Sequence, residues 1–223
     1  MKFTESTVGR KLLMSVTGLA MIGFVIVHLL GNLSVYAGPD AINAYSAALH
    51  RLGPVVWAFR LVLLAALVVH IFFGVQLTLE NSAAKPEPYA VKKSLHTTFA
   101  ARNMIWTGLL IAAFIAYHLL HFTFQVTNPG TSALHHHDAL GRPDVFMMVV
   151  SGFRNGLISS AYVGAMAMLG LHLSHSIQSL FQTLGLNSAR TFPVIEKGGS
   201  ITALLLALGF VSIPIVIVMG LLK

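Results

Sequence analysis

The sequence predicts an all-α integral membrane protein, with a bundle of four transmembrane helices and a fifth helix at its periphery. Three observations carry this prediction. Of the 223 residues, 56% are hydrophobic and only 9% are charged, whereas a soluble domain carries roughly 25% charged residues. Five long apolar runs follow one another along the chain. Each of the first four contains at least one histidine, and the fifth contains none.

Each apolar run is longer than the roughly 20 residues that cross the hydrocarbon core of a bilayer as a helix. The predicted spans are 12–36, 55–79, 104–124, 157–180 and 200–222. Buried helices of a soluble protein are the alternative, but five such runs leave too little polar surface to cover them. We therefore expect a single membrane domain over residues 1–223, without a soluble domain or an internal repeat. The longest connector, 125–156, is expected to carry a short surface helix.

Lysine and arginine residues predict the orientation of the spans. One side of the membrane would hold Lys2, Arg10, Lys11, Lys85, Lys92, Lys93, Arg102, Arg190 and Lys197. The opposite side would hold Arg51, Arg60, Arg142, Arg154 and Lys223. Because positive charge is concentrated in cytoplasmic connectors, the N-terminus is expected in the cytoplasm and the C-terminus outside. The net charge of +7 is then explained by these connectors, and nucleic acid is not expected as a partner.

The distribution of chemically active residue types is unusual. The chain has no cysteine, which excludes iron–sulfur ligation, thiolate haem ligation, disulfides and thiol catalysis. All 7 acidic residues lie in connectors or at the ends of spans, so the ionisable residues inside the spans are histidines. Ionisable residues at membrane depth mark functional sites by default.

Four of these histidines lie at two depths. His28 and His118 each lie about four residues, or ~6 Å, on the outer side of the middle of their span. His70 and His172 lie about three residues toward the cytoplasm, so the two levels differ by roughly 11 Å. Two neutral imidazoles can fill both axial positions of a haem iron without burying a charge. The pattern therefore predicts two b-type haems that carry electrons, although interhelical hydrogen bonds or a proton relay are the alternative reading.

Other residues have less specific patterns. Small residues in the histidine-bearing spans leave room for a flat macrocycle, and they also simply pack transmembrane helices; they are Gly18, Gly74, Gly108, Gly164 and Gly170. His121 and His175 each lie one turn beyond a ligand candidate. They are candidates for bonding a haem propionate or a quinone, or are interfacial histidines. The run His135–His137 and the residues His50 and His96 are expected at the surface.

Several short motifs carry a family resemblance. They are Ser15-Val16-Thr17-Gly18-Leu19 with Val27-His28-Leu29, then Val69-His70-Ile71, Ala116-Tyr117-His118-Leu119, and Gly170-Leu171-His172-Leu173-Ser174-His175 running to Leu184-Gly185. With these motifs in this order, the chain resembles the cytochrome b membrane-anchor subunit of succinate dehydrogenase and fumarate reductase, in the five-helix, two-haem class. The resemblance covers all five spans.

The resemblance implies a set of ligands and partners. His28 with His118 would hold the outer, distal haem, and His70 with His172 the inner, proximal haem. Ser15 matches a position near the propionates of the inner haem, or it is a packing serine. The resemblance also implies a flavoprotein subunit with FAD and an iron–sulfur subunit, docked on the cytoplasmic side of a bacterial cytoplasmic membrane. The basic residues expected at that docking face are Lys85, Lys92, Lys93, Arg102 and Arg190.

The predicted function is electron transfer from the iron–sulfur subunit through two b haems to a quinone, as part of succinate:quinone oxidoreductase (respiratory complex II). Rival readings are the anchor of a hydrogenase or formate dehydrogenase, and a haem-free transporter that uses histidines. The quinone site is expected near the outer haem, and menaquinone is favoured because the membrane potential would assist outward electron flow. The residues available there are His50, Arg51, Trp57, Arg60, His121 and Arg154.

One position departs from the family pattern. Some menaquinol-oxidising fumarate reductases carry a glutamate two positions before the fourth ligand, where it serves transmembrane proton transfer. This chain has Gly170 there. The departure argues against that proton route and favours succinate oxidation as the working direction.

Overall fold

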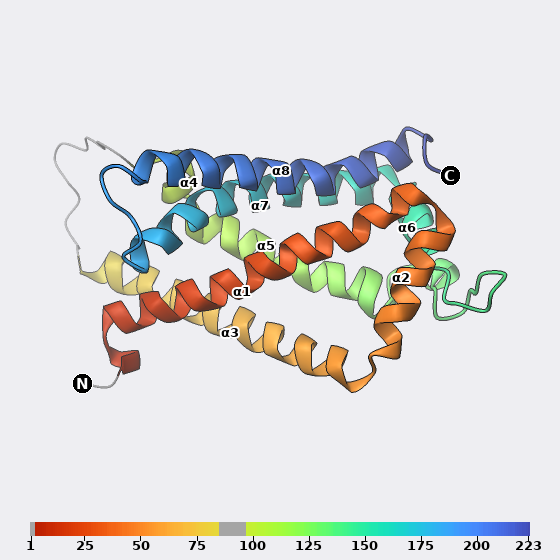
Figure 1. Cartoon of the computed structure of the whole chain (residues 1–223), viewed down its shortest axis with the longest axis horizontal. Coiled ribbons are helices and arrows are strands. Elements are labelled where there is room, and N and C mark those ends of the chain that lie inside the picture. Colours follow the sequence, from red (N-terminus) through yellow and green to blue (C-terminus); the bar gives the residue numbers. More distant parts are fainter. Residues whose placement is uncertain (1–2, 85–96) are drawn as a thin grey trace.

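A computed structural model describes residues 3–84 and 97–223 of the chain. It contains five long helices that lie side by side (Figure 1): α1 (Thr7–Leu33), α3 (Pro54–Ala83), α5 (Met104–His118), α7 (Gly156–Thr183) and α8 (Phe192–Val218). Together with short 3-10 and π extensions, all five are long and apolar enough to cross a membrane. The predicted fold class is therefore confirmed, and the chain is a multi-pass membrane protein.

The two ends of the bundle differ in structure (Figure 1). The start of α1 and the short helix α4 (Phe99–Arg102) lie at one end, which we call the inner end after the predicted orientation. The helices α2 (Pro39–Arg51) and α6 (Val145–Phe153) lie at the opposite, outer end, where the C-terminus also lies.

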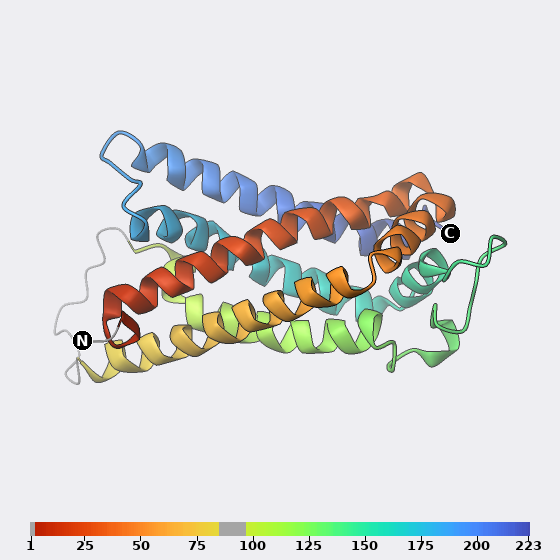
Figure 2. The same ribbon diagram turned by 60° about the horizontal axis from the view of Figure 1, so that its bottom comes forward.

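Helix α8 lies outside the bundle formed by α1, α3, α5 and α7. In Figures 1 and 2 it runs along one side of the molecule, away from α3, and it packs on α7 and α1. Small residues permit this close packing. A Cβ atom on Gly209 would lie 2.8 Å from Leu29 of α1, and one on Gly170 would lie 3.1 Å from the Cβ of Ala207. Gly170 thus faces α8, so a glutamate at this position would have to displace that contact.

The ends of the helices follow capping groups as well as hydrophobicity. The side chain of Ser6 accepts a hydrogen bond from the backbone of Gly9, so α1 begins before its apolar run. Helix α8 begins at Phe192, several residues before the predicted span, and ends at Val218. Helix α5 ends at His118, where the chain widens into the π-helix η3 (Leu119–Thr123).

The outer end holds two helices that cap the bundle. The sequence analysis treated α2 as part of a connector, because its hydrophobicity is low. The short helix expected in the connector 125–156 exists as α6, but it is not at the surface. Phe146, Val150 and Phe153 of α6 are buried, so the expectation of a surface helix was wrong: these side chains pack into the main hydrophobic cluster.

A buried asparagine joins the two caps. The Asn43 side chain of α2 is fully buried, accepts a hydrogen bond from the Phe146 backbone at 3.0 Å, and donates to Asp138 and Asp144. Arg142 pairs with both Asp138 and Asp40. Partial burial works to raise the pKa of Asp138, but hydrogen bonds from Arg142, Leu140 and Asn43 prevail and lower it to about 2.

The first four long helices form two similar halves. In α1, Met14, Thr17-Gly18, Phe24 and His28-Leu29-Leu30 recur at the same spacing in the third span as Met104, Thr107-Gly108, Phe114 and His118-Leu119-Leu120. In α3, His70 and Gln76 have the same spacing as His172 and Gln178 in α7. Helix α1 packs on α3, and α5 packs on α7. The expectation of no internal repeat was therefore wrong, because strict identity is limited to a few positions that contact histidines.

Candidate haem sites in the bundle

The inner pair of histidines, His70 of α3 and His172 of α7, face each other across the bundle. Their ring centroids lie 6.5 Å apart, with an angle of 64° between the rings. The two residues belong to different halves of the repeat and occupy equivalent positions in them. Equivalent histidines from the two halves are thus brought to one place.

Each histidine of the inner pair is held by a threonine of its own half. Nδ1 of His70 lies 3.1 Å from the carbonyl oxygen of Met14 and 3.3 Å from the hydroxyl of Thr17. Nδ1 of His172 lies 3.1 Å from the hydroxyl of Thr107. Both hydroxyls donate to carbonyls of their own helices, so they accept from the imidazoles. Because each Nδ1 then carries the proton, each Nε2 keeps its lone pair for a metal.

Glycines next to these threonines leave room for the imidazole rings. A Cβ atom on Gly18 would lie 3.4 Å from Cε1 of His70, and one on Gly108 would lie 3.3 Å from Cε1 of His172. The second distance is tighter than most real Cβ contacts. The Thr-Gly dipeptide therefore has two functions, which are to accept from Nδ1 and to let the ring lie against the helix.

The outer pair, His28 of α1 and His118 of α5, also face each other. Their ring centroids lie 5.8 Å apart, with an angle of 88° between the rings. Phe24 stacks on His28 at 5.1 Å, and the equivalent Phe114 lies 5.9 Å from His118. Nδ1 of His118 lies 3.4 Å from the hydroxyl of Tyr162. The partners of the outer pair are therefore mainly aromatic.

The donor set suits a bis-imidazole haem in both places. Two imidazoles that share one metal at about 2 Å from each nitrogen have ring centroids roughly 6 Å apart, which is close to both observed separations. In the described residues, no group of three or more His, Cys, Asp or Glu side chains could hold a metal ion. Ligation by two histidines from opposite sides is what remains, so the residues fit the predicted group.

Two predicted neighbours of the inner haem lie on the inner side of the inner pair. Ser15 of α1 is buried. His175 lies one turn beyond His172 on α7, and its Nδ1 is the one buried side-chain nitrogen or oxygen in residues 3–84 and 97–223 that has no hydrogen-bond partner. A buried donor without a partner is costly, and an anionic acceptor such as a propionate would satisfy it.

The residues predicted to surround the quinone are not gathered in one place. His50 makes its hydrogen bond within α2, to the carbonyl oxygen of Ser46 at 2.8 Å. The guanidinium of Arg60 lies over the exposed ring of Trp57, 5.0 Å from its centroid. The side chains of Arg51 and Arg154 are exposed. Of the six residues, His121 alone is buried, and its exposed fraction is 2%.

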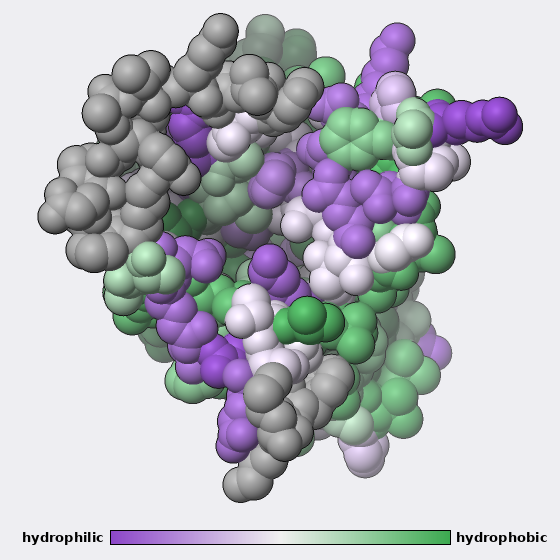
Figure 3. Space-filling view, turned by 90° about the vertical axis from the view of Figure 1, so that its left-hand side faces the viewer, coloured by the Kyte–Doolittle hydropathy of each residue, from purple (hydrophilic) through white to green (hydrophobic). Residues whose placement is uncertain are grey.

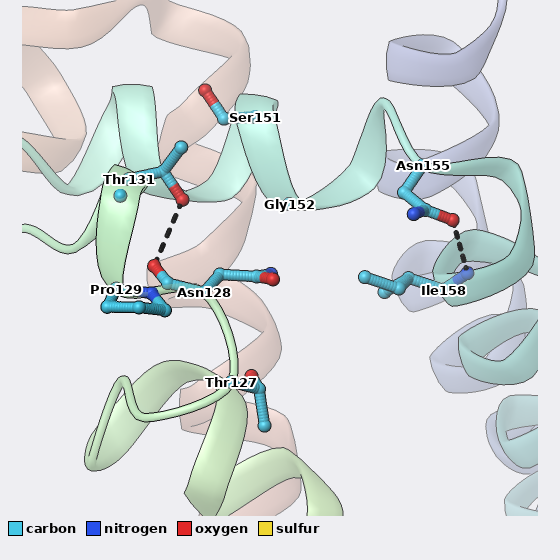
Figure 4. A pocket seen from close by; sticks show the side chains of 9 residues that line it. Thr127, Asn128, Pro129, Thr131, Ser151, Gly152, Asn155 and Ile158 are labelled. Atoms are coloured by element: carbon cyan, nitrogen blue, oxygen red, sulfur yellow. Dashed lines mark hydrogen bonds between the residues drawn. The ribbon is translucent and has the colours of Figure 1, made fainter.

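The structure reveals a polar pocket that the sequence analysis missed. It lies at the outer end, between the loop that follows α5 and the junction of α6 with α7, and has a volume of about 380 Å³. Its lining residues are Thr127, Asn128, Pro129, Gly130, Thr131, Ser151, Gly152, Asn155 and Ile158 (Figure 4). Asn128 also contacts His121, so the pocket borders the one predicted quinone residue that is buried.

The inner end carries the exposed charge that was predicted. Figure 3 looks onto this end and shows hydrophilic side chains gathered there. Arg102, Arg190 and Lys197 are exposed, whereas Arg10 pairs with Glu80 of α3 and with backbone carbonyls of Thr4 and Glu5. The remaining basic residues predicted at this face lie outside the described residues; they are Lys2, Lys85, Lys92 and Lys93.

These features define a multi-pass membrane protein with two facing pairs of histidines in its bundle. Residues 5–102 match the family model of the succinate dehydrogenase/fumarate reductase transmembrane subunit. The comparisons with curated proteins and with solved structures gave no match. The matched region contains one histidine of each pair, His28 and His70. The match supports the family resemblance of the motifs, and such a subunit implies soluble catalytic subunits beside a membrane.

The internal repeat connects the matched region to the rest of the bundle. Helices α5 and α7 lie beyond residue 102, but they repeat the histidines and the Thr-Gly dipeptide of α1 and α3. The second half therefore has the same pattern as the half that the family model matches.

Proposed function

We propose that this chain is the di-haem cytochrome b membrane anchor of succinate:quinone oxidoreductase. In this proposal it conducts electrons from an iron–sulfur subunit at the inner end to a quinone at the outer end of the bundle. The dicarboxylate site and FAD would lie on a partner flavoprotein. We place the complex in the cytoplasmic membrane of a bacterium.

The observation that carries the proposal is the geometry of the two histidine pairs. Each pair joins equivalent positions of the two halves, with ring centroids at the separation that a shared metal requires. Both inner imidazoles have Nδ1 engaged in hydrogen bonds. An ordinary interhelical hydrogen bond between two histidines would instead use one nitrogen of each ring to bind the other ring.

The chain's own residues supply ligands, orientation and a dry surrounding. The inner pair and the outer pair would each provide two neutral Nε2 ligands. Thr17 and Thr107 orient the inner rings, and Tyr162 contacts the outer ring of His118. Bound haem would supply the one-electron redox chemistry. Because both axial positions are filled by protein, the sites suit electron transfer rather than oxygen binding.

The two depths explain why the chain would need two such sites. A quinone reduced near the inner end would need one haem or none, whereas two levels suit electron transfer across the membrane. The exposed basic residues at the inner end (Figure 3) suit the docking of soluble subunits. The polar pocket beside His121 (Figure 4) lies at the opposite end, where a quinone headgroup would arrive.

A spectrum of the purified complex tests the proposal. The dithionite-reduced minus oxidised difference should show low-spin b-type haem, and haem quantitation should give two haems for each chain. Purification from native membranes should bring down a flavoprotein and an iron–sulfur protein. A chain without haem would favour a transporter instead, and co-purification with hydrogenase or formate dehydrogenase subunits would assign the anchor to that enzyme.

The direction of electron flow gives a second test. Outward electron flow is assisted by about 2.3 kcal/mol per 100 mV of inside-negative potential, which matters most for a low-potential quinone, and we therefore favour menaquinone. In coupled membranes, an uncoupler should slow succinate oxidation by menaquinone and should not slow fumarate reduction by menaquinol. If neither direction responded, the quinone would be reduced at the inner end, or proton movement would compensate the charge.

A further inference from the structure

A chain of buried hydrogen-bonding groups leads away from the outer pair. The hydroxyl of Tyr162 lies 3.4 Å from Nδ1 of His118 and 2.9 Å from Nδ1 of His121. Nε2 of His121 lies 2.8 Å from the side-chain amide of Asn128. Tyr162 and His121 have exposed fractions of 6% and 2%, so water does not substitute for these partners.

The backbone is shaped to place His121 in this chain. His121 lies in the π-helix η3, directly after the α-helix that ends at His118. A π-turn inside a transmembrane helix is rare and is frequently found at functional sites. Across from it, a Cβ atom on Gly152 of α6 would lie 3.1 Å from Nε2 of His121. The wide turn and this glycine together leave space for the imidazole and for Asn128 beside it.

Ligation of His118 would fix the direction of every hydrogen bond in the chain. With Nε2 of His118 on a metal, its neutral imidazole carries the proton on Nδ1 and donates it to the hydroxyl of Tyr162. That hydroxyl has a single hydrogen, which it then donates to Nδ1 of His121. His121 in turn carries its proton on Nε2 and donates to the amide oxygen of Asn128. Each buried group finds one partner of the correct kind, so the chain has one consistent arrangement.

The first half of the repeat lacks this chain. The position equivalent to His121 is Gly31, and the position equivalent to Tyr162 is Arg60. A Cβ atom on Gly31 would lie only 2.5 Å from the hydroxyl of Tyr45, so no side chain fits there, and Arg60 lies over Trp57. The chain therefore serves His118 and not His28.

We propose that Tyr162 is a positioning residue that accepts the Nδ1 proton of His118, with its own hydrogen held by His121, and thereby lowers the midpoint potential of the outer haem. This inference rests on the proposed function. An acceptor on Nδ1–H makes the imidazole a stronger donor through Nε2. A stronger axial donor stabilises the ferric state, and hydrogen bonding to axial ligands is one of the ways in which proteins set haem potentials.

A redox titration of the whole complex tests this role. Tyr162→Phe should retain two haems and raise the midpoint potential of the outer haem, while the midpoint potential of the inner haem stays unchanged. Tyr117→Phe is the matched control, because its ring lies 6.1 Å from that of Tyr162 and stacks on His121, but its hydroxyl has no place in the chain. The His70→Ala complex, which is expected to keep the outer haem alone, assigns the two potentials.

A second variant guards against misfolding of the first. His121→Phe keeps an aromatic ring in the π-turn and leaves Tyr162 able to accept from His118, so it should raise the outer potential by less than Tyr162→Phe does. An unchanged outer potential in Tyr162→Phe, or an equal rise of both potentials, would overturn the role of Tyr162. A wild-type complex with fewer than two haems would instead refute the proposed function.

Discussion

The inner and outer pairs of histidines are built on the same repeat, but their surroundings differ. Around the inner pair, each half contributes the same Thr-Gly dipeptide, and each threonine hydroxyl lies within 3.3 Å of Nδ1 of a histidine in its own half. Around the outer pair, only His118 has the Tyr162 contact and the chain beyond it. The comparison teaches that the repeat supplies two equivalent frames, and that residues outside the repeat make the frames functionally different.

The repeat also separates the residues that orient the histidines from the contacts that unite the bundle. Thr17 and Thr107 each act within one half, whereas each histidine pair spans both halves. A group held by both members of a pair would therefore tie the two halves together. Because a ligand that binds only the folded state stabilises it, we expect the bundle to be more stable with both sites filled than with one.

Loss of a ligand is the largest expected effect and tests whether the two pairs are independent. Replacing either histidine of the inner pair with alanine should remove one haem of two, and the same change in the outer pair should remove the other. The remaining haem should keep its spectrum, because the two levels are separate. Haem quantitation per chain measures this outcome, and His121→Ala should retain both haems. A variant that lost both haems with the fold intact would mean that the two pairs act as one site.

Filling the space of the Thr-Gly dipeptide is the next largest effect. Gly108→Val adds a Cβ atom about 3.3 Å from Cε1 of His172, together with two methyl groups, so the imidazole must move. We expect the inner haem to be largely lost and the outer haem to be retained. Gly23→Val is the matched control, because a Cβ atom there meets nothing within 4 Å. Equal loss of the two haems in Gly108→Val would show general misfolding of the bundle.

Removing the threonine hydroxyls tests the symmetry of the inner pair. Thr17→Val and Thr107→Val keep the shape of the side chain but remove the acceptor for Nδ1. Loss of such an outer partner typically weakens a metal site about 10–100-fold, so each variant should lower the affinity for the inner haem by a similar factor. Titration of the haem-depleted complex with haemin measures both affinities. Markedly unequal effects would mean that the Met14 carbonyl already suffices for His70.

The smallest effect concerns the cap at the outer end. The pKa of Asp138 is lowered from 3.8 to about 2, so its contribution to stability is complete above about pH 4 and is lost as the pH falls toward 2. Protease cleavage of the loop 125–144 should therefore increase over this interval. In Asp138→Asn, cleavage should already be high at pH 5 and should change less between pH 4 and 2. Identical pH profiles for the two proteins would assign the acid sensitivity to another group.

Much of the architecture could be predicted from the sequence because it depends on local properties. Hydrophobic length decides which segments can cross a bilayer, and the regular rise of a helix converts the positions of His28, His70, His118 and His172 into two depths. The Thr-Gly dipeptides were within reach as well, since Thr17-Gly18 and Thr107-Gly108 precede their histidines by the same spacing. They were missed because most of the intervening residues differ between the two halves.

The remaining features required the tertiary structure. Helix α2 was read as a connector because few of its side chains are apolar, yet Asn43 of that helix is fully buried against α6. His121 looked like any histidine one turn beyond a ligand until the π-turn placed it beside Tyr162, which comes from a different helix. The sequence by itself determined the five spans and the depths of the four histidines, because hydrophobicity and helical rise act along the chain. Only the tertiary structure decided which side chains hold each imidazole, because those contacts join residues far apart in the sequence.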